Sequence, residues 1–355
     1  MDAGLWINTA WLKKLGLEMP KTTEEFYKAL VAFRDGDPNG NGIKDEIPLG
    51  AMQSQAHCSL DPLFGAFGTM DYLEYVYQNN EGKVVFGGTE DSYRNAIDWL
   101  HTLYSEGLID PECFTMTDAQ FSAKAQGKDM VYGALMFWMP DSMDSRYYDD
   151  YEAVMPLKST EDVSPLWPTA KMPNGTITGF TITTACKNPA ALVRYYDNNI
   201  ANLENVMAWY NGEEGKGIWK RVDGTKWAET AEYMPEGVNM SEFERTVAVG
   251  PLSPAYMWSK YNSLRVQEER MIKKINANNG YLALAATRMI NGLWVPEDLS
   301  ERELLYTDID NYMKKFKANA IVNGIDDAAW AEHLATLESL KVNEYVGLWQ
   351  KFCDK

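Results

Sequence analysis

A loop dense in acidic residues, asparagines and glycines occupies residues 35–48, with the sequence DGDPNGNGIKDEIP. Upstream of it, Thr22 and Glu25 form a capping-box pattern. Apolar residues then recur on one helical face, at Phe26, Leu30 and Phe33. Downstream, Pro48 disfavours a helical conformation for the residue before it. The sequence therefore predicts a helix, an acidic loop and an extended segment, in that order.

Two sets of metal ligands fit this loop. One set matches the EF-hand pattern, with Asp35, Asp37, Asn39, Gly40 and Glu46. An EF-hand also needs a helix after the loop, and Pro48 argues against one. The other set supplies six oxygen ligands, from Asp37, Asn39, Asn41, the Ile43 carbonyl, Asp45 and Glu46. Six such oxygens suit Ca²⁺ better than Mg²⁺ or Zn²⁺. The alternative is a turn whose side chains bind only their own backbone.

The composition is that of a globular protein and excludes several function classes. The chain has 355 residues, of which 45% are hydrophobic, so it is long enough for two lobes with separate cores. Its net charge of −18 repels nucleic acids and anionic membranes, and we expect no nucleic-acid partner. It contains no run of 18 uncharged apolar residues and no signal-peptide pattern. The four cysteines form no CxxC pair and therefore no zinc or thioredoxin-type motif.

Helical and strand patterns alternate along the chain. Periodicity predicts a helix over 91–106, and Gly107 would end it. The apolar run at 130–140 predicts a buried strand, and 179–183 predicts another. A helix should begin at Asn188-Pro189, and the last third of the chain, from Tyr261, should be mainly helical. This alternation is typical of an α/β protein built as three-layer lobes.

Four stretches of the chain together resemble the family 1 extracellular solute-binding proteins. The similarity is to the larger lipoprotein branch, which delivers oligosaccharides to ABC importers. The stretches are residues 11–49, LYSEGLIDPECFT at 103–115, GFTITTACKNPAALVRYYD at 179–197 and LATLESLKVNEYVGLWQKFCDK at 334–355. In alginate-binding members of this family the acidic loop carries Ca²⁺, and their ligand pattern corresponds to the second set, Asp37 to Glu46. The resemblance therefore implies a structural Ca²⁺ ion.

The resemblance also implies an architecture and a cellular location. It predicts a fold similar to type II periplasmic-binding proteins, with two lobes joined by a hinge. Residues 1–178 and 250–355 would form the C-terminal lobe, and 179–249 would be the remaining part of an incomplete N-terminal lobe. The family's secretion signal, lipid-anchoring cysteine and first half of the N-terminal lobe do not occur in this sequence, so we expect a truncated chain. The full-length protein would be an extracellular, lipid-anchored monomer that passes its oligosaccharide ligand to a permease.

Five aromatic residues lie where ligand sites of α/β proteins occur, in loops and at strand ends. Phe137 and Trp138 precede Pro140, Trp167 lies between two prolines, and Tyr256 and Trp258 follow a proline-rich loop. Aromatic rings stack on the apolar C–H faces of sugars. We predict a ligand platform led by Trp138 and Trp258 and supported by Trp167, Tyr256 and Phe137. Core packing is the alternative for each of them.

No catalytic constellation is visible. The acidic pairs 149–150 and 213–214 are sequence neighbours, whose side chains usually point apart. The histidines lie outside any recognisable serine or cysteine motif, at His57, His101 and His333. We therefore expect a binding protein rather than an enzyme. A carbohydrate-active hydrolase and a Ca²⁺-binding structural or adhesion module are the competing classes.

Overall fold

The computed structural model describes residues 4–127, 129–137, 145–168, 182–224, 226–236, 238, 240–248, 273, 276–277, 279–281 and 296–354. The chain divides into two compact units. Unit 1 comprises residues 1–172 and 270–355, and unit 2 comprises residues 173–269. The lobe boundaries expected from the sequence remain a prediction. In the described part of the chain, no helix combines the length and the apolar character needed to cross a membrane.

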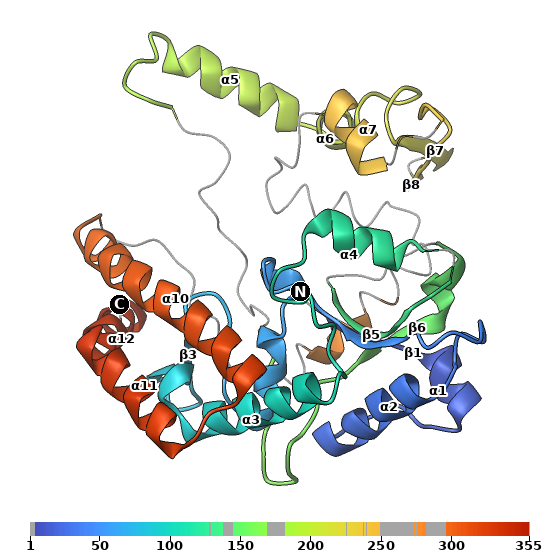
Figure 1. Cartoon of the computed structure of the whole chain (residues 1–355). Coiled ribbons are helices and arrows are strands. Elements are labelled where there is room, and N and C mark those ends of the chain that lie inside the picture. The colour runs from blue at the N-terminus through green and yellow to red at the C-terminus, as the bar shows by residue number, and fades with distance from the viewer. Residues whose placement is uncertain are drawn as a thin grey trace. The chain divides into compact units, whose positions relative to one another are not determined.

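A four-stranded mixed sheet forms the centre of unit 1, in the order β2-β5-β1-β6. Strand β1 (Gly4–Asn8) is antiparallel to both β5 (Tyr132–Phe137) and β6 (Tyr151–Val154). Strand β2 (Ile47–Gly50) is parallel to β5. Every residue of β1 and β5 is buried, which confirms the predicted buried strand. Helices cover both faces in Figure 1, with α1 (Thr9–Leu15) and α2 (Thr23–Asp35) on one side and α4 (Asp118–Ala125) on the other.

Helix α2 begins at the predicted capping box. The Thr22 hydroxyl accepts a hydrogen bond from the Glu25 amide at 3.1 Å, and the Glu25 carboxylate accepts one from the Thr22 amide at 3.2 Å. Its apolar face is fully buried, as the spacing predicted. At Gly133 of β5, an added Cβ would lie 2.2 Å from the Phe33 ring, so only glycine lets this helix approach the strand so closely.

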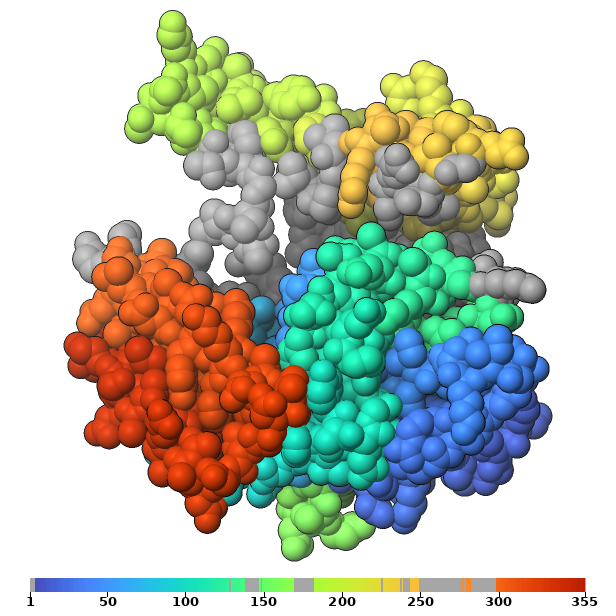
Figure 2. All heavy atoms as spheres, viewed as in Figure 1, coloured from blue at the N-terminus to red at the C-terminus, as the bar shows by residue number. Residues whose placement is uncertain are grey.

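The rest of unit 1 combines short strands and helices. A hairpin of β3 (Val76–Gln78) and β4 (Val84–Phe86) precedes α3 (Asp91–Ser105). Short 3₁₀ segments are η1 (Ala56–Cys58), η2 (Asp61–Phe67), η3 (Gly87–Thr89) and η5 (Ser145–Asp150). The C-terminal helices are α10 (Pro296–Asn323), α11 (Asp327–Ser339) and α12 (Val342–Cys353). Helix α10 packs against α12 and, from the first chain segment of unit 1, against α3. The two chain segments of unit 1 therefore lie side by side (Figure 2). The 91–106 helix is confirmed, and so is the helical character of the C-terminal region over 296–354, whereas most of 261–295 lies outside the described residues.

Unit 2 has a much smaller core. It contains α5 (Pro189–Ile200), α6 (Leu203–Asn211), the hairpin of β7 (Trp219–Asp223) and β8 (Lys226–Glu229), and α7 (Met240–Val247). Helix α5 begins as predicted, because the Asn188 side chain accepts a hydrogen bond from the Ala191 amide at 3.0 Å. No residue of α5 is buried. The buried apolar cluster consists of Val206, Met207, Trp219 and Trp227. Of the strand predicted at 179–183, residues 179–181 lie outside the described residues, and residues 182–183 belong to no strand.

A buried histidine joins α10 and α11 to the segment before α3. His333 is 1% exposed and stacks on the Phe316 ring. Its Nε2 lies 2.8 Å from the Gly88 carbonyl oxygen, and its Nδ1 lies 3.0 Å from the Tyr312 hydroxyl. A neutral ring satisfies both contacts, with Nε2 donating and Nδ1 accepting. Burial lowers the pKa of His333 to about 4.

This depressed pKa predicts acid sensitivity. As the pH falls, the unfolded chain, with a histidine pKa near 6.5, takes up the proton at a higher pH than the folded chain does. The contribution of His333 to stability is therefore complete well above pH 6.5, the unfolded pKa, and is lost as the pH falls toward 4. Between pH 7 and pH 5 we expect the wild type to lose about 2 kcal/mol more unfolding free energy than His333→Gln. Urea unfolding at both pH values measures this, and equal losses in the two proteins would contradict it.

Candidate functional site

The acidic loop, residues 37–46, is curled by two glycines in the left-handed region. Gly40 and Gly42 have φ angles of 78° and 76°. The Asp37 carboxylate accepts hydrogen bonds from both of their amides, at 2.9 and 3.2 Å. The Asn39 side-chain oxygen accepts from the Asn41 amide at 3.0 Å, continuing the same pattern. The first part of the loop therefore has a defined curl fixed by its own side chains.

The second part of the loop gathers carboxylates. Asp45 accepts hydrogen bonds from the side-chain amides of Asn39, at 2.9 Å, and Asn41, at 3.0 and 3.1 Å. Both carboxylate oxygens of Glu46 are buried without a hydrogen-bond partner. Burial raises the pKa of Glu46, because a charged carboxylate is poorly solvated there. A buried carboxylate without a partner is unfavourable, and a cation bound among these oxygens would compensate its charge.

Asp35 and Asp45, which each belong to only one of the two ligand sets, make different contacts. Asp35, which belongs only to the EF-hand set, accepts two hydrogen bonds from the neighbouring Arg34, at 2.8 and 3.0 Å. Asp45, which belongs only to the other set, points toward the loop amides. Among the described residues, no three His, Cys, Asp or Glu side chains converge closely enough to hold a metal by themselves. Any site here would therefore depend on amide and carbonyl oxygens as well.

Contacts tie the acidic loop to three elements of unit 1. Lys14 of α1 donates to the carbonyl oxygens of Asp37, at 2.8 Å, and Pro38, at 3.1 Å. The loop leaves α2 and leads into β2, whose Ile47 amide donates to the Val131 carbonyl just before β5 at 2.7 Å. The loop therefore lies at a junction of the scaffold.

The structure places two of the five predicted aromatic ligand residues. Trp167 is 2% exposed and stacks on Tyr281, with ring centroids 4.6 Å apart. Phe137 is buried at the end of β5 and stacks on Phe121. These contacts are core packing, the alternative that the sequence left open. The other three, Trp138, Tyr256 and Trp258, lie outside the described residues, and the aromatic platform remains a prediction.

A pocket of about 490 Å³ lies within unit 1, a volume within the range of small-molecule sites. We call it the α10 pocket, because four of its polar or aromatic lining residues belong to that helix: Tyr306, Asp310, Lys314 and Lys317. Its other walls come from the segment after β2, the turn before β3 and Phe114, which contribute side chains such as Gln53, Asp61, Leu73 and Tyr75. Sequence reasoning missed this pocket, since its walls come from four separate parts of the chain.

Two charged residues that line the α10 pocket, Lys317 and Asp61, form an ion pair, and Asp71 pairs with the same lysine. Lys317 is 2% exposed, and its Nζ lies 2.5 Å from Asp61 Oδ1 and 2.8 Å from Asp71 Oδ2. Tyr93 donates a hydrogen bond to the same Asp71 oxygen at 3.0 Å. Burial raises the pKa of Asp71. Burial would lower the pKa of Lys317, but the two adjacent carboxylates more than offset this and raise it.

A strained turn forms one rim of the α10 pocket. Leu73 and Tyr75 have φ angles of 49° and 60°, a region that residues other than glycine rarely adopt. Glu74 between them is held from the C-terminal helices, by Arg302 at 3.1 Å and by the Tyr345 hydroxyl at 2.7 Å. The Leu73 side chain is left 47% exposed at the pocket. Backbone strain of this kind is often associated with ligand sites.

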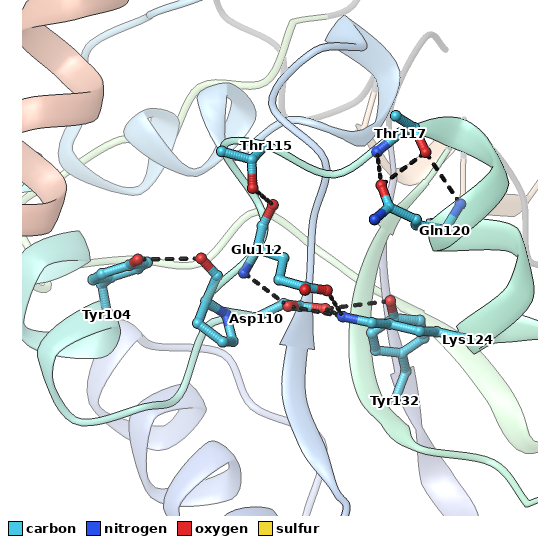
Figure 3. Close-up of polar contacts among 9 residues, drawn as sticks. Tyr104, Asp110, Glu112, Thr115, Thr117, Gln120, Lys124 and Tyr132 are labelled. Atoms are coloured by element: carbon cyan, nitrogen blue, oxygen red, sulfur yellow. Dashed lines mark hydrogen bonds and ion pairs between the residues drawn. The ribbon is translucent and has the colours of Figure 1, made fainter.

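Another buried carboxylate, that of Asp110, fixes the segment between α3 and α4 (Figure 3). Asp110 is fully buried, and Lys124 of α4 reaches it at 2.8 Å. The Glu112 amide donates to Asp110 at 3.0 Å, and the Tyr132 hydroxyl of β5 donates to it at 3.4 Å. Asp110 therefore links α4 to the sheet. It belongs to the LYSEGLIDPECFT stretch, and its role here is structural.

Comparison with known proteins identifies the class of this fold. No protein-family model matches the chain. Its fold is similar to that of the substrate-binding protein FusA of a Streptococcus pneumoniae ABC transporter, solved in complex with kestose, with a TM-score of 0.83 and 26% identity over 100% of this chain and 72% of that one. An extracellular solute-binding protein from Bifidobacterium longum subsp. infantis gives a TM-score of 0.82 at 23% identity, over 100% and 73% of the two chains. The expected periplasmic-binding-protein fold is confirmed.

The sequences agree with this class. The chain is 29% identical to the fructooligosaccharide ABC transporter substrate-binding protein FusA over 363 residues, which cover 99% of this chain. It spans 65% of the length of FusA. It is also 34% identical to the lipoprotein LipO of Bacillus subtilis over 122 residues, which cover 33% of this chain and 23% of LipO. The family resemblance is therefore confirmed: homologues and structural neighbours of this chain are substrate-binding proteins of ABC transporters. FusA is, by its name, a transport protein.

The buried ion pairs of the α10 pocket give a stability prediction. Lys317→Met would leave the Asp61 and Asp71 carboxylates without a cation, and we expect it to lower the unfolding free energy by about 3–5 kcal/mol. Adding Asp71→Asn should recover part of this loss. The matched control is Lys314→Met on the same helix, where an ion pair with an exposed lysine contributes only about 0–1 kcal/mol. Equal stabilities of the two single variants, measured by urea unfolding, would contradict a stabilising role for the buried pairs.

Proposed function

We propose that this chain belongs to the extracellular substrate-capture component of an ABC importer for oligosaccharides. The observation that carries the proposal is the similarity to FusA along 99% of the chain, in sequence and in fold. Capture would occur by closure of two lobes on the sugar, followed by delivery to a permease, with no covalent chemistry. The full-length protein would act as a lipoprotein, as the presence of the lipoprotein LipO among the relatives supports, and we propose that it is a monomer.

Physical properties of the chain favour a neutral ligand. The net charge of −18 opposes the approach of polyanionic glycans, although a local cationic cluster could offset it. FusA, by its name, binds fructooligosaccharides, which are uncharged. We therefore propose a neutral oligosaccharide as the ligand, with the aromatic platform led by Trp138 and Trp258 as part of its binding surface.

A glycan array probed with the full-length protein tests this function. We expect binding to neutral oligosaccharides, with kestose as the first probe and polygalacturonan fragments as the charged comparison. A hydrolysis assay on each bound glycan distinguishes capture from catalysis. Turnover above background that one carboxylate substitution abolishes would overturn the proposal in favour of a hydrolase. The absence of binding to any glycan would favour a structural or adhesion module.

We also propose that the acidic loop binds one structural Ca²⁺ ion, with Asp37, Asn39, Asn41, the Ile43 carbonyl, Asp45 and Glu46 as ligands. The buried, unpartnered Glu46 carboxylate supports this, because a cation would neutralise it. The relative FusA has also been solved as an EF-hand mutant, with a TM-score of 0.83 to this chain, which indicates that FusA contains an EF-hand-type loop. The ion would tie α2 to β2 without contacting the sugar.

Calcium-dependent melting tests the loop. Ca²⁺ at 100 times its Kd should add about 2.7 kcal/mol to the unfolding free energy of the wild type. Asp45→Ala should abolish this gain, since Asp45 is a ligand only in the proposed set. Asp35→Ala, the matched control, should keep it, since Asp35 is a ligand only in the EF-hand set. A wild type that melts identically in Ca²⁺ and in EDTA would show that the loop is an empty turn.

A further inference from the structure

We propose that the α10 pocket is a saccharide subsite that holds one neutral sugar ring of the ligand. This inference rests on the proposed function and adds a location and a selectivity to it. Three features of the pocket carry it: carboxylates that can accept hydrogen bonds from hydroxyls, an exposed apolar rim, and cations that are already neutralised.

The carboxylates are held in place by other protein groups. Asp61 receives hydrogen bonds on Oδ1 from Lys317, at 2.5 Å, and from Gln53, at 2.6 Å. Asp310 receives one from the Tyr75 hydroxyl at 2.8 Å. A carboxylate oxygen has more than one acceptor position, so each group retains capacity for a sugar hydroxyl. Hydrogen bonds from hydroxyls to such fixed, charged acceptors are strong and directional.

The rim of the pocket offers an apolar surface for a sugar ring. Leu73 is 47% exposed, although its neighbours Tyr72 and Tyr75 are buried. Its positive φ of 49° keeps the side chain at the pocket at an energetic cost. Phe114 and Tyr306, both half-buried, line the same pocket. Sugars present apolar C–H faces between their hydroxyls, and a wall of this composition is complementary to them.

The charges of the pocket favour a neutral ring over a uronate. Two ammonium groups and two carboxylates line it, and each ammonium is paired with one of these carboxylates. Lys317 lies 2.5 Å from Asp61, and Lys314 lies 2.6 Å from Asp310. A sugar carboxylate would therefore meet no unpaired cation among the described lining residues and would face two negative groups. Uncharged hydroxyls avoid this repulsion.

Two substitutions test the subsite without disturbing its buried ion pairs. Leu73→Gly removes the apolar side chain and suits the positive φ, so the melting temperature should stay constant or rise. Lys314→Ala removes an exposed partner of Asp310. The matched controls are Leu304→Ala, which changes a leucine of α10 that is 75% exposed and does not line the pocket, and Lys315→Ala.

Binding is measured by calorimetry on the full-length protein with a panel of neutral tri- and tetrasaccharides that includes kestose, and the tightest binder serves as the probe. We expect Leu73→Gly to weaken binding about tenfold. Lys314→Ala should weaken it severalfold, because Asp310 Oδ2 loses the partner that holds it in place, and the controls should bind unchanged. Trigalacturonate should bind more weakly than the probe.

The outcomes separate the two proposals. If the wild type binds a neutral sugar and both pocket variants bind it as tightly, the subsite is wrong and the proposed function stands. If trigalacturonate binds more tightly than every neutral sugar, the inferred selectivity is wrong. If the wild type binds no oligosaccharide, the proposed function and the subsite fail together.

Discussion

The ion pairs of Lys317 are the contact on which much of unit 1 depends. A lysine that is 2% exposed lies against two carboxylates, and both belong to a segment some 250 residues earlier in the chain. The attraction between these groups offsets the loss of hydration that each suffers on burial, which none of them could tolerate alone. Helix α10 is thereby fixed against the segment that carries Asp61 and Asp71. The same contact positions Lys317 and Asp61, which line the α10 pocket, so packing and the candidate ligand site share one set of residues.

The acidic loop also brings carboxylates close together, at the junction of α2 and β2. It collects Asp37, Asp45 and Glu46 within ten residues, where α2 ends and β2 begins. Backbone amides and asparagine side chains compensate two of these carboxylates, whereas at Glu46 the effect of burial exceeds that of the nearby Glu46 and Asn39 amides and raises the pKa. Lys14, the nearby cation from α1, bonds to backbone carbonyls of the loop. A divalent cation therefore complements the loop chemically in a way that the described protein groups do not.

The sequence predicted best what is determined locally. The capping box at Thr22, the buried strand ending at Phe137 and the helix beginning after Asn188 all follow from patterns within a few residues, and the structure contains them. Family resemblance predicted the fold because it spans nearly the whole chain. The α10 pocket could not be predicted in this way. Its walls come from distant segments, and the positive φ angles of Leu73 and Tyr75 flank Glu74, which residues of the C-terminal helices bind.

Trp167 illustrates the same limit of local reasoning. Flanking prolines indicated a loop residue available to a ligand, but its partner Tyr281 is more than a hundred residues away, and the two rings stack closely. Single-residue context cannot reveal a partner at such a separation. Aromatic residues are more often buried than exposed, because their large apolar rings gain most from packing. A ligand role for any one of them therefore needs tertiary evidence.

The discontinuity of unit 1 has a consequence for how the protein is made. Asp61 leaves the ribosome 256 residues before Lys317, and all of unit 2 is synthesised in between. The pair of Asp61 and Lys317 therefore closes a loop of 256 residues, and the entropic cost of closing a loop rises with its length. Until α10 packs against α3, the apolar surface of α3 that it covers stays exposed to other chains. A folding intermediate that contains only the first segment of unit 1 would therefore expose this surface, and association between chains during refolding would begin there.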